Sequence, residues 1–308
     1  MARFLGVDLG GTNIKWVVLE HDGEQAFGQP LATGSSPTGA AEGPDGVTGR
    51  VVAVVRDAMA RHAPIAAAGV GVPGLFGRDT GLIELFPNLP GPWAGYPLRD
   101  RVAASAGIPV TLVNDARAFT LAEGLAGAGR GARTVACLTL GTGVGGGIMI
   151  DGRLHLGANG RAGEIGHQTV LADGPRCGCG NPGCVESLTQ ARALTTLAGR
   201  ERVEDVYAGL AAGDAACVAA IESVTDWLAI GIANVVTVLV PDRVVIGGGI
   251  ASAGEGLLAR LCGAVRRRTP RGDPENIVIV AAELGSSAGA IGAALAAATA
   301  RDEAIAMT

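Results

Sequence analysis

The sequence lacks the excess of positive charge that nucleic-acid binding requires. Its 308 residues carry a formal net charge of -5 at pH 7, whereas contact with a phosphate backbone needs a concentrated basic surface. The one basic run, Arg266 to Arg268, comes shortly before Pro270. We interpret it as the solvated C-terminus of a helix, where the helix dipole favours positive charge. We therefore expect no nucleic-acid partner.

The sequence also lacks a signal peptide and a long apolar run. The opening "MARFLGVDLGGT" has an apolar stretch too short for a signal-peptide core and runs into a glycine pair. The most apolar stretch, residues 227–240, is shorter than the roughly 20 residues that cross a bilayer, and contains Asn234 and Thr237. We predict a buried helix there, no membrane partner and a cytoplasmic protein whose cysteines stay reduced.

Aromatic residues are scarce at 3%, whereas glycine is abundant at 50 residues, without a periodic repeat or a Gly/Ser tract. Much of the glycine must therefore serve turns and close backbone approach. Two turns stand out, "DLGGTN" from Asp8 and "TLGTGVGGG" from Thr139, each after an apolar strand. In such turns backbone N–H groups can approach phosphate oxygens and the threonine adds a donor. Each turn alone is equally well explained as a structural hairpin.

No standard nucleotide-binding motif fits these turns. A P-loop ending in GK[ST] is absent, and the nearest literal GxGxxG match, residues 141–146, lies between predicted strands instead of opening a helix. A third glycine run at residues 247–249 follows the apolar stretch "RVVI". This third run favours a nucleotide site of a different kind.

Strands alternate with helices along the chain, which predicts an α/β fold with its site at strand ends. The length predicts about two domains, and the two similar glycine turns indicate a duplicated fold. We expect strands over residues 3–9 and 14–20, a weaker one near Phe27, and further strands over 66–72, 109–114, 134–140, 144–150, 242–247 and 276–284. We expect helices over residues 46–63, 97–106 and 288–300.

Three cysteines lie close together in "RCGCGNPGCVE", ten residues after a histidine. The spacing His167, Cys177, Cys179 and Cys184 offers one imidazole and three thiolates in a Gly- and Pro-rich loop, which is a standard tetrahedral zinc set. The alternatives are three incidental thiols or a redox CxC pair, which the third cysteine and the histidine weaken. Cys137, Cys217 and Cys262 lie in apolar contexts and are interpreted as small buried side chains.

Asp115 follows the predicted strand "PVTLVN" and would lie at its carboxyl end. A carboxylate there can accept the proton of a hydroxyl nucleophile. The alternative is that Asp115 caps the helix that begins at "ARAFTLAEGLAG".

The motifs taken together resemble the ROK family of sugar kinases and regulators across nearly the full chain. The resemblance rests on "GVDLGGTNIK", "GVGVPG", "PNLPGPW", "VNDA", "TLGTGVGGGI", "GANGRAGEIGH", "CGCGNPGCVE", "PDRVVIGGGI" and "LGSSAGAIGAA". It implies an actin-like ATPase fold, a ribonuclease H-like duplication with two lobes and a cleft between them. The smaller α/β lobe would comprise residues 1–116 plus 289–308, and the larger, with the zinc loop, residues 117–288.

The resemblance further implies transfer of the γ-phosphoryl group of ATP to a sugar hydroxyl, commonly the 6-hydroxyl of glucose, with Mg²⁺. Asp115 would be the general base and Asp8 would face the magnesium. The implied sugar contacts are Asn88, Asn114, Asp115, Glu164, His167 and Glu186. The implied phosphate contacts are Gly10, Gly11, Thr12, Gly141, Thr142 and Gly143, with Gly247 and Gly248 near the adenosine. A structural Zn²⁺ on His167, Cys177, Cys179 and Cys184 would fix Glu164 and Glu186 at the sugar.

The sequence departs from the family pattern at Arg117 and Phe119, beside the catalytic strand, and at Asn13, where many members carry lysine, with Lys15 two positions on. The exact sugar and the donor, ATP or polyphosphate, therefore stay open. Members of the family commonly form dimers or tetramers, so the resemblance implies a homodimer or homotetramer.

Three alternatives to a glucokinase follow. A kinase for N-acetylglucosamine or N-acetylmannosamine shares the same hydroxyl-reading residues, and glucose is preferred on family frequency alone. A sugar-binding regulator without catalysis would carry a helix-turn-helix domain ahead of the first glycine motif, which here starts at residue 6. A zinc-ribbon interaction module would need two paired knuckles instead of one loop.

Overall fold

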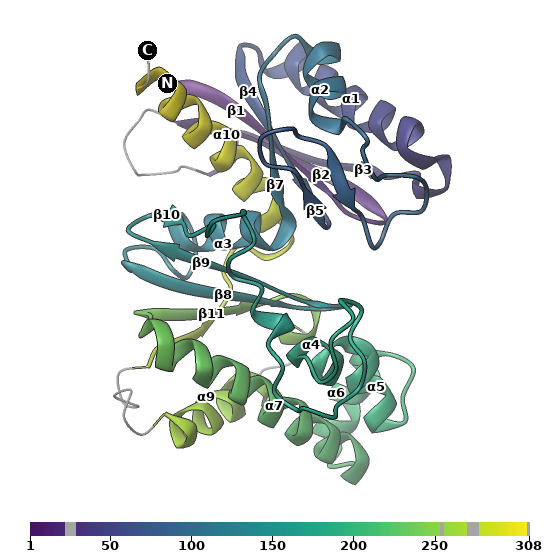
Figure 1. Cartoon of the computed structure of the whole chain (residues 1–308), viewed down its shortest axis with the longest axis vertical. Helices are drawn as coiled ribbons and strands as arrows, with labels where there is room; N and C mark the ends of the chain where they lie inside the picture. The colour runs from purple at the N-terminus through teal and green to yellow at the C-terminus, as the bar shows by residue number, and fades with distance from the viewer. Residues whose placement is uncertain (22–28, 253–255, 270–276, 307–308) are drawn as a thin grey trace. The chain divides into compact units, whose positions relative to one another are not determined.

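The computed structural model describes residues 1–21, 29–252, 256–269 and 277–306 (Figure 1). These residues form two compact units, Met1–Ala126 with Ser286–Thr308, and Gly127–Gly285. The first unit therefore takes in the last helix of the chain. The weak strand expected near Phe27 lies outside the described residues.

The first unit is built on a sheet of order β3-β2-β1-β4-β7. Its strands are β1 (Ala2–Leu9), β2 (Asn13–His21), β3 (Ala32–Pro37), β4 (Ile65–Val72) and β7 (Val110–Asn114). Its helices are α1 (Gly43–His62), α2 (Leu98–Ala106), α3 (Asp115–Leu125) and α10 (Ala288–Ala306). Its short elements are η1 (Ala40–Glu42), β5 (Leu75–Phe76), β6 (Ile83–Leu85) and η3 (Gly285–Ser287), the last at the boundary of the unit.

The second unit repeats this plan with a sheet of order β10-β9-β8-β11-β12. Its strands are β8 (Thr134–Leu140), β9 (Val144–Ile150), β10 (Arg153–Leu154), β11 (Arg243–Gly247) and β12 (Ile279–Ala281). Its helical elements are η2 (Ile165–His167), α4 (Val185–Thr189), α5 (Ala191–Ala198), α6 (Val203–Ala211), α7 (Ala215–Leu239), α8 (Gly249–Ser252) and α9 (Gly256–Arg268).

The two sheets share one pattern of strand directions. In the first, β1 pairs antiparallel with β2 and parallel with β4, and in the second β8 pairs antiparallel with β9 and parallel with β11. Each sheet continues outward with a further antiparallel strand on one side and a further parallel strand on the other. This confirms the predicted duplicated α/β fold, and each glycine turn lies where the first hairpin of its sheet reverses.

Helix α10 packs directly on the first sheet, and α3 packs on α10. A Cβ at Gly6 of β1 would lie 1.8 Å from the carbonyl oxygen of Ala290, and one at Gly292 would lie 1.7 Å from that of Ala118. Because α3 makes this close contact, it belongs to the first unit, which extends to Ala126 instead of ending at the expected residue 116.

Helix α7 is the one helix among the described residues that is long and apolar enough to cross a membrane. Its buried side chains, among them Ile221, Leu228 and Ile232, pack into the core of the second unit with residues of β8 and β11. Figure 1 shows α7 and α9 on one side of that sheet, and Arg268 at the end of α9 donates to Asp226 of α7 at 3.0 Å. This packing agrees with the buried helix expected over residues 227–240, and α9 ends in the basic run as predicted.

Two glycines in helices make a matched test of this packing. Alanine should stabilise a helix interior by about 0.5–1 kcal/mol relative to glycine, and Gly49 of α1 has open space around its Cβ position. We expect Gly49→Ala to raise the free energy of unfolding by about that amount. Gly292→Ala should instead lower it by about 1–3 kcal/mol, because the methyl group meets backbone that cannot move aside. Urea unfolding of both variants measures the difference, and equal effects would contradict the described contact of α10 with α3.

Candidate functional site

The first glycine turn joins β1 to β2 and is held by backbone contacts. The N–H of Gly10 donates to Asn13 O at 3.1 Å, and Thr38 donates from Oγ1 to Gly10 O at 2.6 Å and from N to Thr12 O at 2.9 Å. Gly11 and Thr12 remain exposed at the tip of the turn. These hydrogen bonds therefore fix the backbone of the turn and leave its tip exposed.

Asn114 and Asp115 occupy the junction between β7 and α3. Asn114 is the N-cap of α3: its Oδ1 accepts from the N–H groups of Ala116 and Arg117 at 3.1 and 3.2 Å, and its Nδ2 donates to Gly74 O at 3.1 Å. The capping alternative weighed for Asp115 is therefore wrong, because the preceding residue fills that role. Asp115 accepts from Ala116 N at 2.8 Å through Oδ1 and exposes its carboxylate.

Asp8 lies near the end of β1, with Asp115 among the charges that act on it. The pKa of Asp8 is raised to about 6 by its burial and, to a smaller extent, by the nearby Asp115 carboxylate, with Lys15 acting in the opposite direction. Lys15 also donates from Nζ to Ser286 O at 3.2 Å. Helix α10 also packs against Asp8, since a Cβ at Gly289 would lie 2.7 Å from Asp8 Oδ2. Two carboxylates in one place are the oxygen donors that Mg²⁺ prefers, so the donor set fits that ion.

Asn88 is exposed in the loop between β6 and α2. The loop is anchored by aromatic packing: the rings of Phe86 and Trp93 have centroids 4.7 Å apart, and Trp93 Nε1 donates to Pro90 O at 3.2 Å. The backbone of Asn88 also borders the first turn, because a Cβ at Gly11 would lie 3.4 Å from Asn88 O. The first unit thus gathers Asn88, Asp8, Asp115 and the first turn at one end of its sheet.

The second glycine turn, Gly141 to Gly143, joins β8 to β9. Inside it, Gly141 N donates to Gly143 O at 2.9 Å, and Thr142 is exposed. From outside, Ala191 N donates to Gly141 O at 2.8 Å. Gly247 is in register with Thr139 of β8, and Gly248, at φ 90°, would place a Cβ 2.4 Å from Leu140 O. The second unit therefore brings the glycines predicted for phosphate and adenosine binding to adjacent strand ends.

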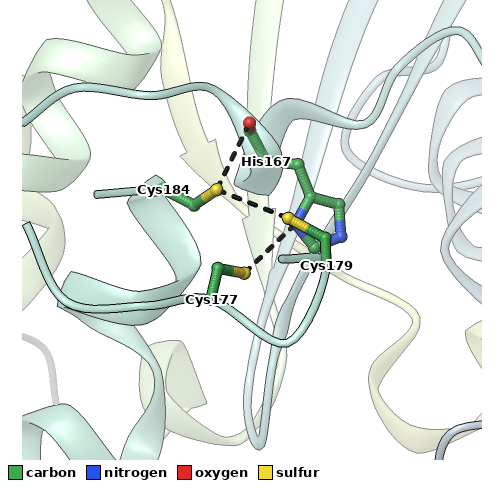
Figure 2. Close-up of side chains that lie close together, drawn as sticks. All are labelled: His167, Cys177, Cys179 and Cys184. Atoms are coloured by element: carbon green, nitrogen blue, oxygen red, sulfur yellow. Dashed lines mark hydrogen bonds between the residues drawn. The ribbon is translucent and has the colours of Figure 1, made fainter. Parts of the chain in front are cut away.

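His167, Cys177, Cys179 and Cys184 form one cluster in the second unit, with ligand atoms all within 4.8 Å of one another (Figure 2). His167 Nδ1 and Cys177 Sγ are 3.5 Å apart, and Cys179 Sγ and Cys184 Sγ are 3.6 Å apart. Ligands of a tetrahedral zinc with Zn–S of about 2.3 Å and Zn–N of about 2.0 Å lie roughly 3.5–3.8 Å from one another. The cluster fits a zinc ion.

Short backbone contacts fold the cysteine loop. Cys177 N donates to Asn181 O at 2.8 Å, and Gly183 N donates to Pro175 O at 2.8 Å. Burial raises the pKa of the thiols of Cys177 and Cys184, so a bound cation would have to displace their protons. Cys137 and Cys217 are buried and Cys262 is half-buried, as expected for packing residues.

The remaining predicted sugar residues of the second unit surround this cluster. His167 directs Nδ1 to the cysteines, and its Nε2 lies 4.0 Å from Glu164 Oε2, so one ring can serve both predicted roles. Glu186 accepts from Cys177 Sγ at 3.2 Å through Oε1 and from Val144 N at 2.9 Å through Oε2. The contacts from Val144 and Ala191 had no signal in the sequence, because every residue except proline carries a backbone N–H.

The chain is similar in sequence to a known protein family and to proteins of known activity. The family model described as "ROK family" matches residues 4–300. The chain is 33% identical to the glucokinase of Streptomyces coelicolor over 96% of this chain and 97% of that protein. It is 32% identical to the N-acetylmannosamine kinase of Citrobacter koseri over 94% and 97% of the two chains.

Two solved structures are similar over nearly the whole chain. The ROK hexokinase from Thermus thermophilus has a TM-score of 0.87 at 35% identity, with 98% of this chain and 99% of that one covered. A ROK family glucokinase from Streptomyces griseus, in complex with glucose and AMPPNP, has a TM-score of 0.80 at 31% identity, with 97% and 100% covered.

The raised pKa of Asp8 predicts a pH-dependent stability cost. Because the folded-state pKa of about 6 exceeds the ordinary 3.8, the ionisation of Asp8 costs the wild-type protein a contribution to stability that is lost as the pH rises from 3.8 to 6, and the cost is constant above that. Asp8→Asn removes this cost and should be more stable by up to about 3 kcal/mol above pH 6. The gain should shrink as the pH falls toward 3.8. Urea unfolding at pH 4.5 and 8 tests this, and a gain independent of pH would contradict it.

The cluster geometry predicts one zinc ion per chain. Cys179 is exposed, so Cys179→Ser removes a ligand with little effect on packing and should lower the bound zinc well below one equivalent. Cys262→Ser, outside the cluster, should retain it. Elemental analysis of the purified proteins measures the metal, and equal zinc contents in the two variants would count against the cluster as the site.

Proposed function

We propose that this chain, which belongs to the ROK family and is a sugar kinase, phosphorylates the 6-hydroxyl of glucose with ATP as donor. The observation that carries the proposal is the exposed carboxylate of Asp115, placed at a strand end beside Asp8 and oriented by its bond to Ala116 N. ATP as donor is supported by the AMPPNP complex of the similar glucokinase. Glucose is supported by the glucokinases among the relatives.

In the proposed mechanism Asp115 accepts the proton of the sugar hydroxyl as the new O–P bond forms and the bond to ADP breaks. Asn114 contributes by holding the start of α3, which fixes the backbone of Asp115. Its Oδ1 is committed to the cap and one Nδ2 hydrogen to Gly74 O, so its second Nδ2 hydrogen is the group that would contact sugar.

The other proposed sugar contacts are Asn88, Glu164, His167 and Glu186. Carboxylates and amides can each engage adjacent hydroxyl groups of a pyranose, and leaving them unpaired on the wrong sugar is costly. The proposed phosphate contacts are the two glycine turns, with Gly247 and Gly248 near the adenosine. Magnesium, when bound, would neutralise charge on the triphosphate, and Asp8 would hold it. The structural zinc would orient Glu164 and Glu186 through His167 and the cysteines.

A panel of sugars tests the substrate. A coupled assay of ADP formation across glucose, mannose, fructose, N-acetylglucosamine and N-acetylmannosamine should give the highest kcat/KM with glucose. A higher value with N-acetylmannosamine would replace glucose by the sugar of the Citrobacter koseri relative. Turnover with polyphosphate in place of ATP would change the donor, and no turnover with any sugar would favour a sugar-binding regulator.

Removal of the proposed base tests the mechanism. Asp115→Asn should lower kcat by roughly 10²–10⁴-fold, because the amide cannot accept the proton, while the fold and the cap at Asn114 stay intact. Asp57→Asn removes an acid that pairs with Arg61 on α1 and should leave kcat unchanged. Full activity of the Asp115 variant would exclude it as the base.

A further inference from the structure

The second glycine turn is held by the segment that follows the cysteine loop. Glu186 Oε2 accepts from Val144 N at 2.9 Å, and Ala191 N donates to Gly141 O at 2.8 Å. Both contacts leave the exposed tip at Thr142 untouched. The position of this turn therefore depends on the position of α4 and of the first residue of α5.

The same segment begins at a ligand of the metal cluster. Cys184 is the N-cap of α4, and Ser187 Oγ donates to Cys184 O at 2.8 Å. The other oxygen of Glu186 accepts from Cys177 Sγ at 3.2 Å. One carboxylate thus lies between a metal ligand and the glycine turn. Because a bound zinc would take the proton of Cys177, the connection in the metal-bound protein would run through the backbone from Cys184 into α4.

The segment that carries the ligand His167 also contacts Val144, the first residue of β9. Gly166 precedes His167, and a Cβ at Gly166 would lie 1.9 Å from Val144 O. The N–H and the C=O of Val144 therefore each face a segment that carries a ligand. Helix α4 has five residues, too few for a helix to be stable by itself, so its anchors at Cys184 and in the core set its position.

We infer that the Cys3His cluster positions the nucleotide's phosphate-binding turn as well as the sugar pocket, with Glu186 and α4 as the connection. This rests on the proposed function, in which Gly141 to Gly143 bind phosphate. Glu186 is then a positioning residue for nucleotide binding in addition to its proposed contact with sugar. Loss of the metal should weaken nucleotide binding even when no sugar is present.

The test is calorimetric titration of AMPPNP with Mg²⁺ into zinc-loaded protein without sugar. Under these conditions a lost sugar contact cannot affect the result. Glu186→Ala removes the acceptor for Val144 N–H and should weaken AMPPNP binding about tenfold. Glu186→Gln retains a carbonyl acceptor and should bind within about threefold of wild type. Glu164→Ala, the same change at the other carboxylate near the cluster, should bind AMPPNP like wild type.

Removal of the metal is the second part of the test. Zinc removed with a chelator should reduce AMPPNP affinity at least as much as Glu186→Ala, and added zinc should restore it, with circular dichroism recording whether the fold persists. Wild-type protein that binds no AMPPNP would overturn the proposed function. Wild-type protein that binds AMPPNP, with Glu186→Ala or chelated protein binding equally well, would overturn this inference alone.

Discussion

The candidate site of the first unit is built around two acidic side chains, Asp8 and Asp115, whose negative charges repel each other. Strand pairing brings them together: β1 and β7 both run parallel to β4, so their carboxyl ends reach the same edge of the sheet. Burial and mutual repulsion then raise the pKa of Asp8 to about 6. Keeping two carboxylates this close costs stability, and acids with perturbed pKa values are typical of functional sites.

The second unit has a sheet of the same plan, with different residues at its strand ends. Its first hairpin carries a glycine turn in the corresponding place, but its strand ends hold glycines instead of acids, and an insertion after β10 carries the Cys3His cluster. The insertion has little regular structure of its own. Backbone contacts such as that of Cys177 N with Asn181 O fold it locally, and a bound zinc ion would supply the crosslink that a small apolar core cannot.

Glu186 shows how the cluster and the turn are connected. Its two oxygens divide between Cys177 and Val144, and a Cβ at Gly143 would lie 2.6 Å from Oε2. A side chain at position 143 would therefore meet this carboxylate and would have to displace it from Val144 N. The usual explanation of a glycine-rich turn, access for a ligand, accounts for only part of this sequence.

The sequence by itself determined the features that are local. The alternation of apolar strands and helices, the two hairpin turns and the spacing of His167 with three cysteines all lie within short segments. The structure has the two hairpins and the cluster where they were expected, whereas the last strand is limited to Ile279–Ala281 of the expected 276–284. Only the tertiary structure decided which residue caps α3, that α3 packs with α10, and that Val144 and Ala191 hold the second turn. These depend on strand register and on backbone groups that all residues share, so no residue type marks them in the sequence.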